Sequence, residues 1–146
     1  MNIEKHLALY GLDQERRSAV NDAAPIIMRH MDSILDDFYK AMESLSGTRD
    51  FFRDPKALAR VRDGQKRHWE QMFTGQIDDE YINSAKRNGR NHYDIGVSPE
   101  LYVGGYNFVL SRITQILLEQ YRFRPNKQKR LTTAVQSIVL LDIELC

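Results

Sequence analysis

Apolar residues recur at helical spacing along almost the whole chain, and no stretch alternates apolar and polar residues as a half-buried strand does. The clearest stripe lies between residues 22 and about 44, where one helical face carries Met28, Met31, Leu35, Tyr39 and Met42. Two shorter helices are expected before it, at about 3–10 and 13–20, as an N-terminal extension over residues 1–20. The pattern therefore predicts an all-α fold.

Capping residues and prolines divide the rest of the chain into further helices. Asp54-Pro55 and Ser98-Pro99 each place an N-capping side chain before a proline at the first helical position, which predicts helices from 55 to 73 and from 99 to about 121. An aspartate pair at 78–79 begins another helix, which carries His92 and ends near Gly96. The segment "RFRPNK" separates a last helix, from about 126 to the end. Roughly six to eight helices with short connections predict a single domain over residues 1–146.

The composition narrows the class of protein. Of the 146 residues, 42% are hydrophobic and 28% are charged, as in an ordinary globular domain. The formal net charge of +1 gives no reason to expect nucleic acid as a partner. The one cysteine, Cys146, excludes an internal disulfide and a cysteine-based metal site, and it suits a reducing compartment. No apolar run approaches the roughly 20 residues that cross a bilayer, and "MNIEKHLALYGL" lacks the core of a signal peptide, so we expect a cytoplasmic protein without membrane contact.

The last two predicted helices carry more apolar residues than one buried stripe requires. Such a helix is either deeply buried or shared with a partner, because an isolated monomer would otherwise expose an apolar patch. The final residues "LLDIELC" contain no glycine, asparagine or proline that would end a helix. We therefore expect a chain cut from a longer protein in which the helix continues, the alternative being a frayed end.

One histidine lies on a predicted helix with little side-chain bulk around it. The side chain of His92 leans toward the N-terminus of its helix, over Gly89, and shares a face with Ile82 and Ala85. A histidine beside a bare turn suits a broad, flat ligand that approaches the backbone, such as a haem held by an axial imidazole. The alternative is a core histidine bonded to a carbonyl, with Gly89 only allowing another helix to cross.

Three segments follow one another along the chain in a characteristic order and spacing: "LDDFYKAM", "QKRHWEQMFTG" and "NGRNHYDIGVSPELYVGGY". Together they resemble the sensor globins of the globin-coupled sensor family, from about residue 22 to the end of the chain. The resemblance implies a globin-like helical sandwich with an extra N-terminal helix and one haem b, with its iron, as cofactor. It also implies a two-fold homodimer in which the last two helices of each chain form a four-helix interface.

The resemblance assigns roles to single residues. His92 would be the proximal iron ligand, Tyr39 the distal tyrosine that hydrogen-bonds dioxygen, and Tyr102 the tyrosine that orients the proximal imidazole. Val61 and Gly64 would line the distal pocket. Gly64 departs from the larger or hydroxyl-bearing residue that is common at this place in the family, which leaves a roomier or wetter pocket.

For the remaining candidate residues, the sequence allows either a role at the haem or an ordinary structural role. Phe52, beside Phe51, would close the edge of the haem pocket; the alternative for these two phenylalanines is ordinary core packing. Gly89 would face the haem. His68 lies one turn beyond Gly64 and is a candidate sixth iron ligand. The alternative is a histidine that is exposed or already hydrogen-bonded by other groups.

These inferences predict a haem-based sensor domain of a bacterial signal transducer. It would bind O2, CO and NO at ferrous haem and relay the ligation state through the dimer interface to an output domain missing from this chain, a diguanylate cyclase or a chemotaxis transducer. The domain itself would catalyse no reaction. The alternatives are a stand-alone protoglobin-like haem protein acting on O2 or NO, and a haem-free helical dimerisation module.

Overall fold

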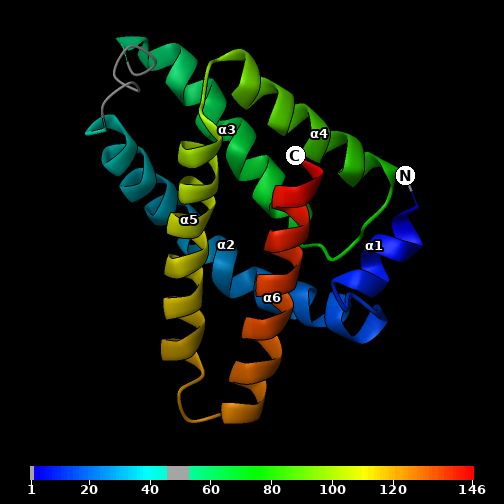
Figure 1. Ribbon diagram of the computed structural model, residues 1–146. Coiled ribbons are helices and arrows are strands. Elements are labelled where there is room, and N and C mark those ends of the chain that lie inside the picture. The colour runs from blue at the N-terminus through cyan, green and yellow to red at the C-terminus, as the bar shows by residue number, and fades with distance from the viewer. Residues whose placement is uncertain (1, 46–52) are drawn as a thin grey trace.

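The structure, a computed structural model, describes residues 2–45 and 53–146, and every regular element in these ranges is an α-helix. The helices are α1 (Ile3–Leu9), α2 (Gln14–Glu43), α3 (Pro55–Met72), α4 (Asp79–Asp94), α5 (Pro99–Gln120) and α6 (Pro125–Leu145). The antiparallel pair α5 and α6 forms one layer, and α2 crosses and packs against both (Figure 1). Helices α3 and α4 pack against each other and against α6. The predicted all-α class is confirmed.

Local hydrogen bonds set where these helices begin. The side chains of Asp13, Asp54, Asp78 and Ser98 each accept a bond from a backbone N–H two or three residues later in the chain. The predicted starts of α3, α4 and α5 are therefore confirmed. Gly96, just after α4, has a φ of 81°, a conformation that residues with a side chain rarely adopt, and it turns the chain toward α5.

The N-terminal extension differs from the prediction. Only α1 stands apart, because residues 14–43 form one continuous helix, α2, which contains Pro25. A separate helix over 13–20 is therefore wrong. The reason is packing: Ala19, Val20, Ala23 and Ile26 are buried in succession, and α2 packs along α5 and α6. That burial offsets the backbone hydrogen bond that a proline inside a helix cannot make.

Helices α2 and α5 approach closely near the middle of the domain. A Cβ added at Gly105 of α5 would lie 3.1 Å from the ring of Phe38 on α2, so the missing side chain leaves room for that ring. The Phe38 ring in turn packs edge-on against Tyr39, with centroids 5.0 Å apart. This crossing fixes the part of α2 that carries Tyr39 beside α5.

The wide apolar arcs of α5 and α6 divide into a buried and an exposed part. Leu117 and Ile138 are 0% exposed and belong to the core of the single chain. By contrast, Val103, Leu118 and Leu140 are 51%, 43% and 44% exposed on the same two helices. Most of the arc is thus explained by burial within the domain, and only the exposed part remains for a partner. Among the helices of the described ranges, none has the length and apolar character needed to cross a bilayer.

Candidate functional site

A crevice with two compartments lies where α2, α3, α4 and α5 meet. The inner cavity, of about 120 Å³, is lined mostly by apolar and aromatic side chains. The outer cleft, of about 780 Å³, lies between α3 and α4 and has a largely polar wall that includes Arg60, Arg67 and Arg87. Val61, Gln65, His92 and Ile95 line both compartments, so these residues stand at their boundary.

The structure brings four of the predicted site residues to the inner cavity. Tyr39 comes from α2, Val61 from α3, His92 from α4 and Tyr102 from α5. The sequence separates these residues widely, and only the helix crossings place them around one space. Their predicted roles toward a haem stay predictions at this point, but their common location is what such roles require.

The side chain of His92 is bonded to a backbone carbonyl, as the core-histidine alternative expects, and metal-binding histidines have the same bond. Its Nδ1 lies 2.7 Å from the backbone carbonyl oxygen of Asn88, one turn earlier. A carbonyl can only accept, so Nδ1 carries the proton and Nε2 of the neutral ring keeps its lone pair. Among the described residues, Nε2 has no hydrogen-bond partner. Burial lowers the pKa of His92, which favours this neutral form.

Tyr39 lines the same cavity with a neutral side chain. Burial is the main cause that raises the pKa of Tyr39 to about 12, and the nearby Arg62 opposes the shift. The phenol therefore keeps its proton at neutral pH and remains a hydrogen-bond donor.

Tyr102 lies directly against the histidine. Its ring meets the ring of His92 edge-on, with centroids 5.1 Å apart, and this contact restricts rotation of the imidazole. Its hydroxyl donates to the hydroxyl of Tyr106, 3.4 Å away, one turn further along α5. Tyr102 thus contacts His92 through its ring and Tyr106 through its hydroxyl.

The two glycines of the predicted site have different surroundings. Gly64 lines the outer cleft only, and a Cβ there would meet no atom closer than the Arg67 guanidinium at 3.9 Å, so space is open beside it. Gly89 lines neither compartment. It faces the end of α6 instead, since a Cβ there would lie 2.2 Å from the backbone carbonyl oxygen of Cys146. The expectation that Gly89 faces the ligand is thus corrected: glycine is needed at this position because α6 crosses α4 there. Phe51 and Phe52 lie outside the described residues.

His68 has the bonding of a satisfied core histidine. It is buried on α3, with Nδ1 3.1 Å from the hydroxyl of Ser84 and Nε2 2.9 Å from both carboxylate oxygens of Asp142. Both ring nitrogens are therefore engaged. This geometry favours the alternative in which His68 is already hydrogen-bonded over a role as a second iron ligand.

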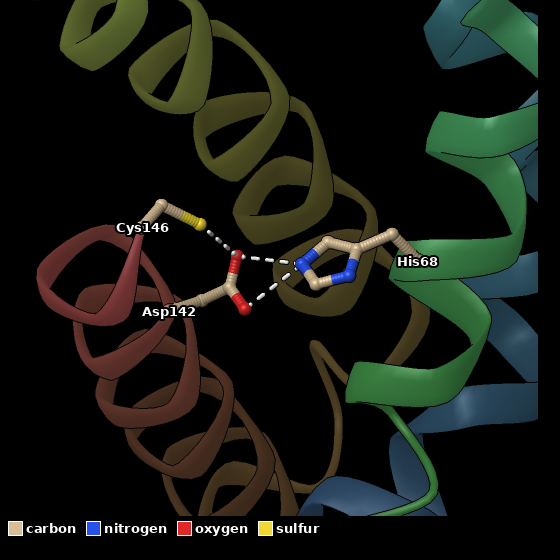
Figure 2. A group of neighbouring side chains, drawn as sticks. All are labelled: His68, Asp142 and Cys146. Carbon is tan, nitrogen blue, oxygen red and sulfur yellow. Dashed lines mark hydrogen bonds and ion pairs between the residues drawn. The ribbon is translucent and has the colours of Figure 1, made fainter. Parts of the chain in front are cut away.

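Asp142 gathers a buried polar cluster that the sequence analysis missed. Its side chain is 0% exposed and accepts hydrogen bonds of 2.6 Å from the hydroxyls of Tyr81 and Tyr106, besides its contact with His68. The Cys146 thiol lies 3.8 Å from one carboxylate oxygen (Figure 2). A signal was available in the sequence: Asp142 interrupts the apolar run "SIVLLDIEL" on the face that carries Ile138 and Val135.

The ligand types in this cluster also suit a metal ion, since one atom each of His68, Asp142 and Cys146 lie within 4.8 Å of one another. The hydrogen bonds argue against that use. The carboxylate already has three close donors, and burial and the carboxylate raise the pKa of the Cys146 thiol to about 11, which keeps the thiol protonated. We therefore treat the group as a closed hydrogen-bond cluster.

Known proteins are similar to this chain in sequence and in fold. The family model described as Protoglobin matches residues 1–146. A curated relative, the heme-based aerotactic transducer HemAT of Halobacterium salinarum, is 28% identical over 101 residues, which make up 68% of this chain and 21% of that protein. The chain thus spans about a fifth of that relative's length.

Solved globin domains superpose on nearly the whole chain. The globin domain of a Geobacter sulfurreducens globin-coupled sensor matches with a TM-score of 0.91 at 17% identity, covering 99% of this chain and 95% of that one. The ferrous globin domain of E. coli DosC matches with a TM-score of 0.77 at 16% identity, covering 96% and 95% of the two chains. These likenesses confirm the predicted globin-like fold.

Proposed function

Since the chain belongs to the protoglobin family, we propose that it binds one haem b between α3 and α4 and serves as the gas-sensing domain of a bacterial signal transducer. The observation that carries this proposal is the state of His92, neutral and with a free Nε2 lone pair at the boundary of the two compartments. A neutral imidazole whose other nitrogen donates to a carbonyl is the form that binds metals.

The polarity of the two compartments matches the two chemical parts of a haem. The macrocycle is apolar, as is most of the inner cavity, and the two carboxylates would meet the positive charge of Arg60, Arg67 and Arg87 in the outer cleft. His92 would hold the iron, with Tyr102 restricting the rotation of its ring. When bound, the ferrous haem supplies a site for diatomic gases at which dioxygen acquires partial negative charge and carbon monoxide acquires little.

An absorption spectrum of the purified protein tests this proposal. We expect an intense Soret band and one haem per chain, with spectral changes on addition of O2, CO and NO. A protein with full helical circular dichroism that takes up no added haem would be the haem-free dimerisation module instead. A stand-alone protoglobin-like haem protein acting on O2 or NO, the other alternative, would consume that gas catalytically when supplied with a reductant, which a sensor domain would not.

Tyr39 is proposed to donate a hydrogen bond to dioxygen in the inner cavity. Replacing it with phenylalanine should speed dissociation of dioxygen at least several-fold, because a buried neutral hydrogen bond contributes about 1 kcal/mol. Dissociation of carbon monoxide should change less, since that gas carries less negative charge. Stopped-flow kinetics with both gases measures the difference. Tyr121→Phe, at the end of α5 and away from the cavity lining, is the matched control, and equal effects of Tyr39→Phe on both gases would point to altered packing.

The output of the sensor is proposed from the longer relatives. HemAT is a transducer of which this chain spans about a fifth, so we propose that a chemotaxis transducer domain, or a diguanylate cyclase, follows the helix α6. In that arrangement the sensor domain catalyses no reaction itself. A cytoplasmic location and the absence of nucleic-acid and membrane partners stay predictions from the composition.

A homodimer built on α5 and α6 is proposed as the form in which the signal is relayed. Val103, Leu118 and Leu140 spread exposed apolar surface along both helices. Leu118→Glu and Leu140→Glu should shift the protein from dimer to monomer, since a charge at the centre of an interface would be buried without a partner. Light scattering at micromolar concentration measures this, with Leu9→Glu on α1, where the leucine is 76% exposed, as the control that keeps the dimer. A monomeric wild-type protein would rule the proposal out.

A further inference from the structure

We propose that Asn88 and the Asp142 cluster connect the gas site to the C-terminal end of α6, so that α6 receives the signal through buried hydrogen bonds. This inference rests on the proposed haem site at His92. The connection itself is made by Asn88, Tyr106 and Asp142, and a separate experiment tests it.

Asn88 joins the two ends of this connection. Its backbone carbonyl accepts the Nδ1 proton of His92 at 2.7 Å, so the position of this carbonyl sets the orientation of the imidazole. Its buried side chain accepts from Nε2 of Gln65 at 2.6 Å and donates to the hydroxyl of Tyr106 at 3.3 Å. One residue therefore contacts the proposed iron ligand, the opposite wall of the crevice on α3, and α5. We regard Asn88 as a positioning residue for His92.

Tyr106 carries the connection from Asn88 to α6. Its hydroxyl lies 2.6 Å from Asp142, on the last turn of α6, and 3.5 Å from the thiol of Cys146, the residue that follows this helix. Tyr102, which touches the ring of His92, reaches the same hydroxyl at 3.4 Å. Two routes from the histidine, through Asn88 and through Tyr102, thus meet at the Tyr106 hydroxyl, and the Asn88 side chain also lies 3.8 Å from the Cys146 thiol directly.

The bond lengths divide this network into a firm part and an adjustable part. The bonds from Tyr81 and Tyr106 to the carboxylate are both 2.6 Å, whereas the bonds from Asn88 and Tyr102 to the Tyr106 hydroxyl are 3.3 and 3.4 Å. Charge-assisted bonds to a buried carboxylate are short and strong, and long neutral bonds are weaker. A small displacement of α4 against α5 would therefore change the long Asn88–Tyr106 bond first, and Tyr106 would pass that change to Asp142.

The backbones of α4 and α6 are in direct contact beside this network. A Cβ on Gly89 would lie 2.2 Å from the carbonyl oxygen of Cys146, so α4 and the end of α6 have no space between them at this crossing. Gly89 follows Asn88 in the chain, on the turn before His92. A shift of this turn therefore reaches the last residues of α6 both by contact and by hydrogen bonding.

Cys146 is the single cysteine of the chain, so the reactivity of its thiol can be used to detect structural changes at the end of α6. Its half-buried thiol contacts both Tyr106 and Asp142. The experiment measures the rate of Cys146 alkylation by a maleimide, followed by mass spectrometry, in the ferrous gas-free protein and in the same protein saturated with carbon monoxide. We expect the two rates to differ about fivefold or more, the lower end of typical coupling between sites.

Two tyrosine variants then separate the proposed connection from general stability. Tyr106→Phe and Tyr81→Phe each delete one buried hydroxyl that donates to Asp142 at 2.6 Å, but only the Tyr106 hydroxyl is also bonded to Asn88. The ratio of the two alkylation rates should fall toward one in Tyr106→Phe and persist in Tyr81→Phe. Asn88→Ala should also lose the ratio, while Asn83→Ala, at an exposed position on the same helix, should keep it.

The outcomes distinguish this inference from the proposed function. Equal rates in the two states of the wild-type protein, with carbon monoxide visibly bound, would overturn the connection and leave the gas site standing. A ratio that survives Tyr106→Phe and Asn88→Ala, or one that is lost equally in Tyr81→Phe, would also overturn it. Absence of any Soret band would overturn the proposed function, and this inference with it.

Discussion

Replacement of His92 by alanine is expected to abolish the normal Soret band of the haem-loaded protein. The imidazole would provide the one protein bond to the iron, through the Nε2 that has no other partner among the described residues. The substitution removes this ligand and the side-chain hydrogen bond to the Asn88 carbonyl, while the backbone of α4 and the rest of the cavity lining stay in place. Free imidazole should therefore enter the space and restore part of the spectrum.

The measurement is haem content per chain after gel filtration, together with circular dichroism to show that the helices remain. His30→Ala is the matched control, because His30 is a half-buried histidine on α2 that lines neither compartment of the crevice. Full haem occupancy and an unchanged spectrum in His92→Ala would remove His92 from the proposed role. The fold assignment would survive that result, since it rests on helix packing and on the structural comparisons.

Replacement of Asp142 by alanine is expected to lower the free energy of unfolding by about 3–5 kcal/mol, the loss typical when one partner of a buried polar or ionic pair is removed. The hydroxyls of Tyr81 and Tyr106 and the ring of His68 would lose their shared acceptor inside the protein. A buried donor without a partner costs about 1–3 kcal/mol. For a domain of this size the melting temperature should fall by roughly 10 °C.

The comparison is with Asp32→Ala, measured by denaturant unfolding at equal haem content. Asp32 also has cationic partners, Arg62 and Lys66, but its side chain is 64% exposed. Exposed ion pairs contribute less than about 1 kcal/mol, so this variant should remain near wild-type stability. If the two aspartates proved equally dispensable, the Asp142 cluster would not stabilise the fold.

The site was predictable to different degrees at different residues. Tyr39, Val61, His92 and Tyr102 were expected from a resemblance in order and spacing, and the structure lines the inner cavity with all four. The residues Gln65 and Asn88 were missed, because a single polar residue on a polar helix face carries no signal until its neighbours are known. Gly89 was noticed for its lack of bulk, but the reason for that lack is the backbone of Cys146.

The sequence alone determined the helical class and the beginnings of most helices. Those features depend on interactions between close neighbours, such as the caps of Asp54, Asp78 and Ser98, whose side chains bond backbone groups two or three residues away. Only the tertiary structure decided that α2 continues through Pro25, that Leu117 and Ile138 face the core, and that Asp142 has donors on three other helices. The hydrogen bonds of Asp142 to Tyr81 and His68 join residues 61 and 74 positions apart. Such contacts exist only once the helices cross, and no local pattern along the chain specifies which side chains will meet there.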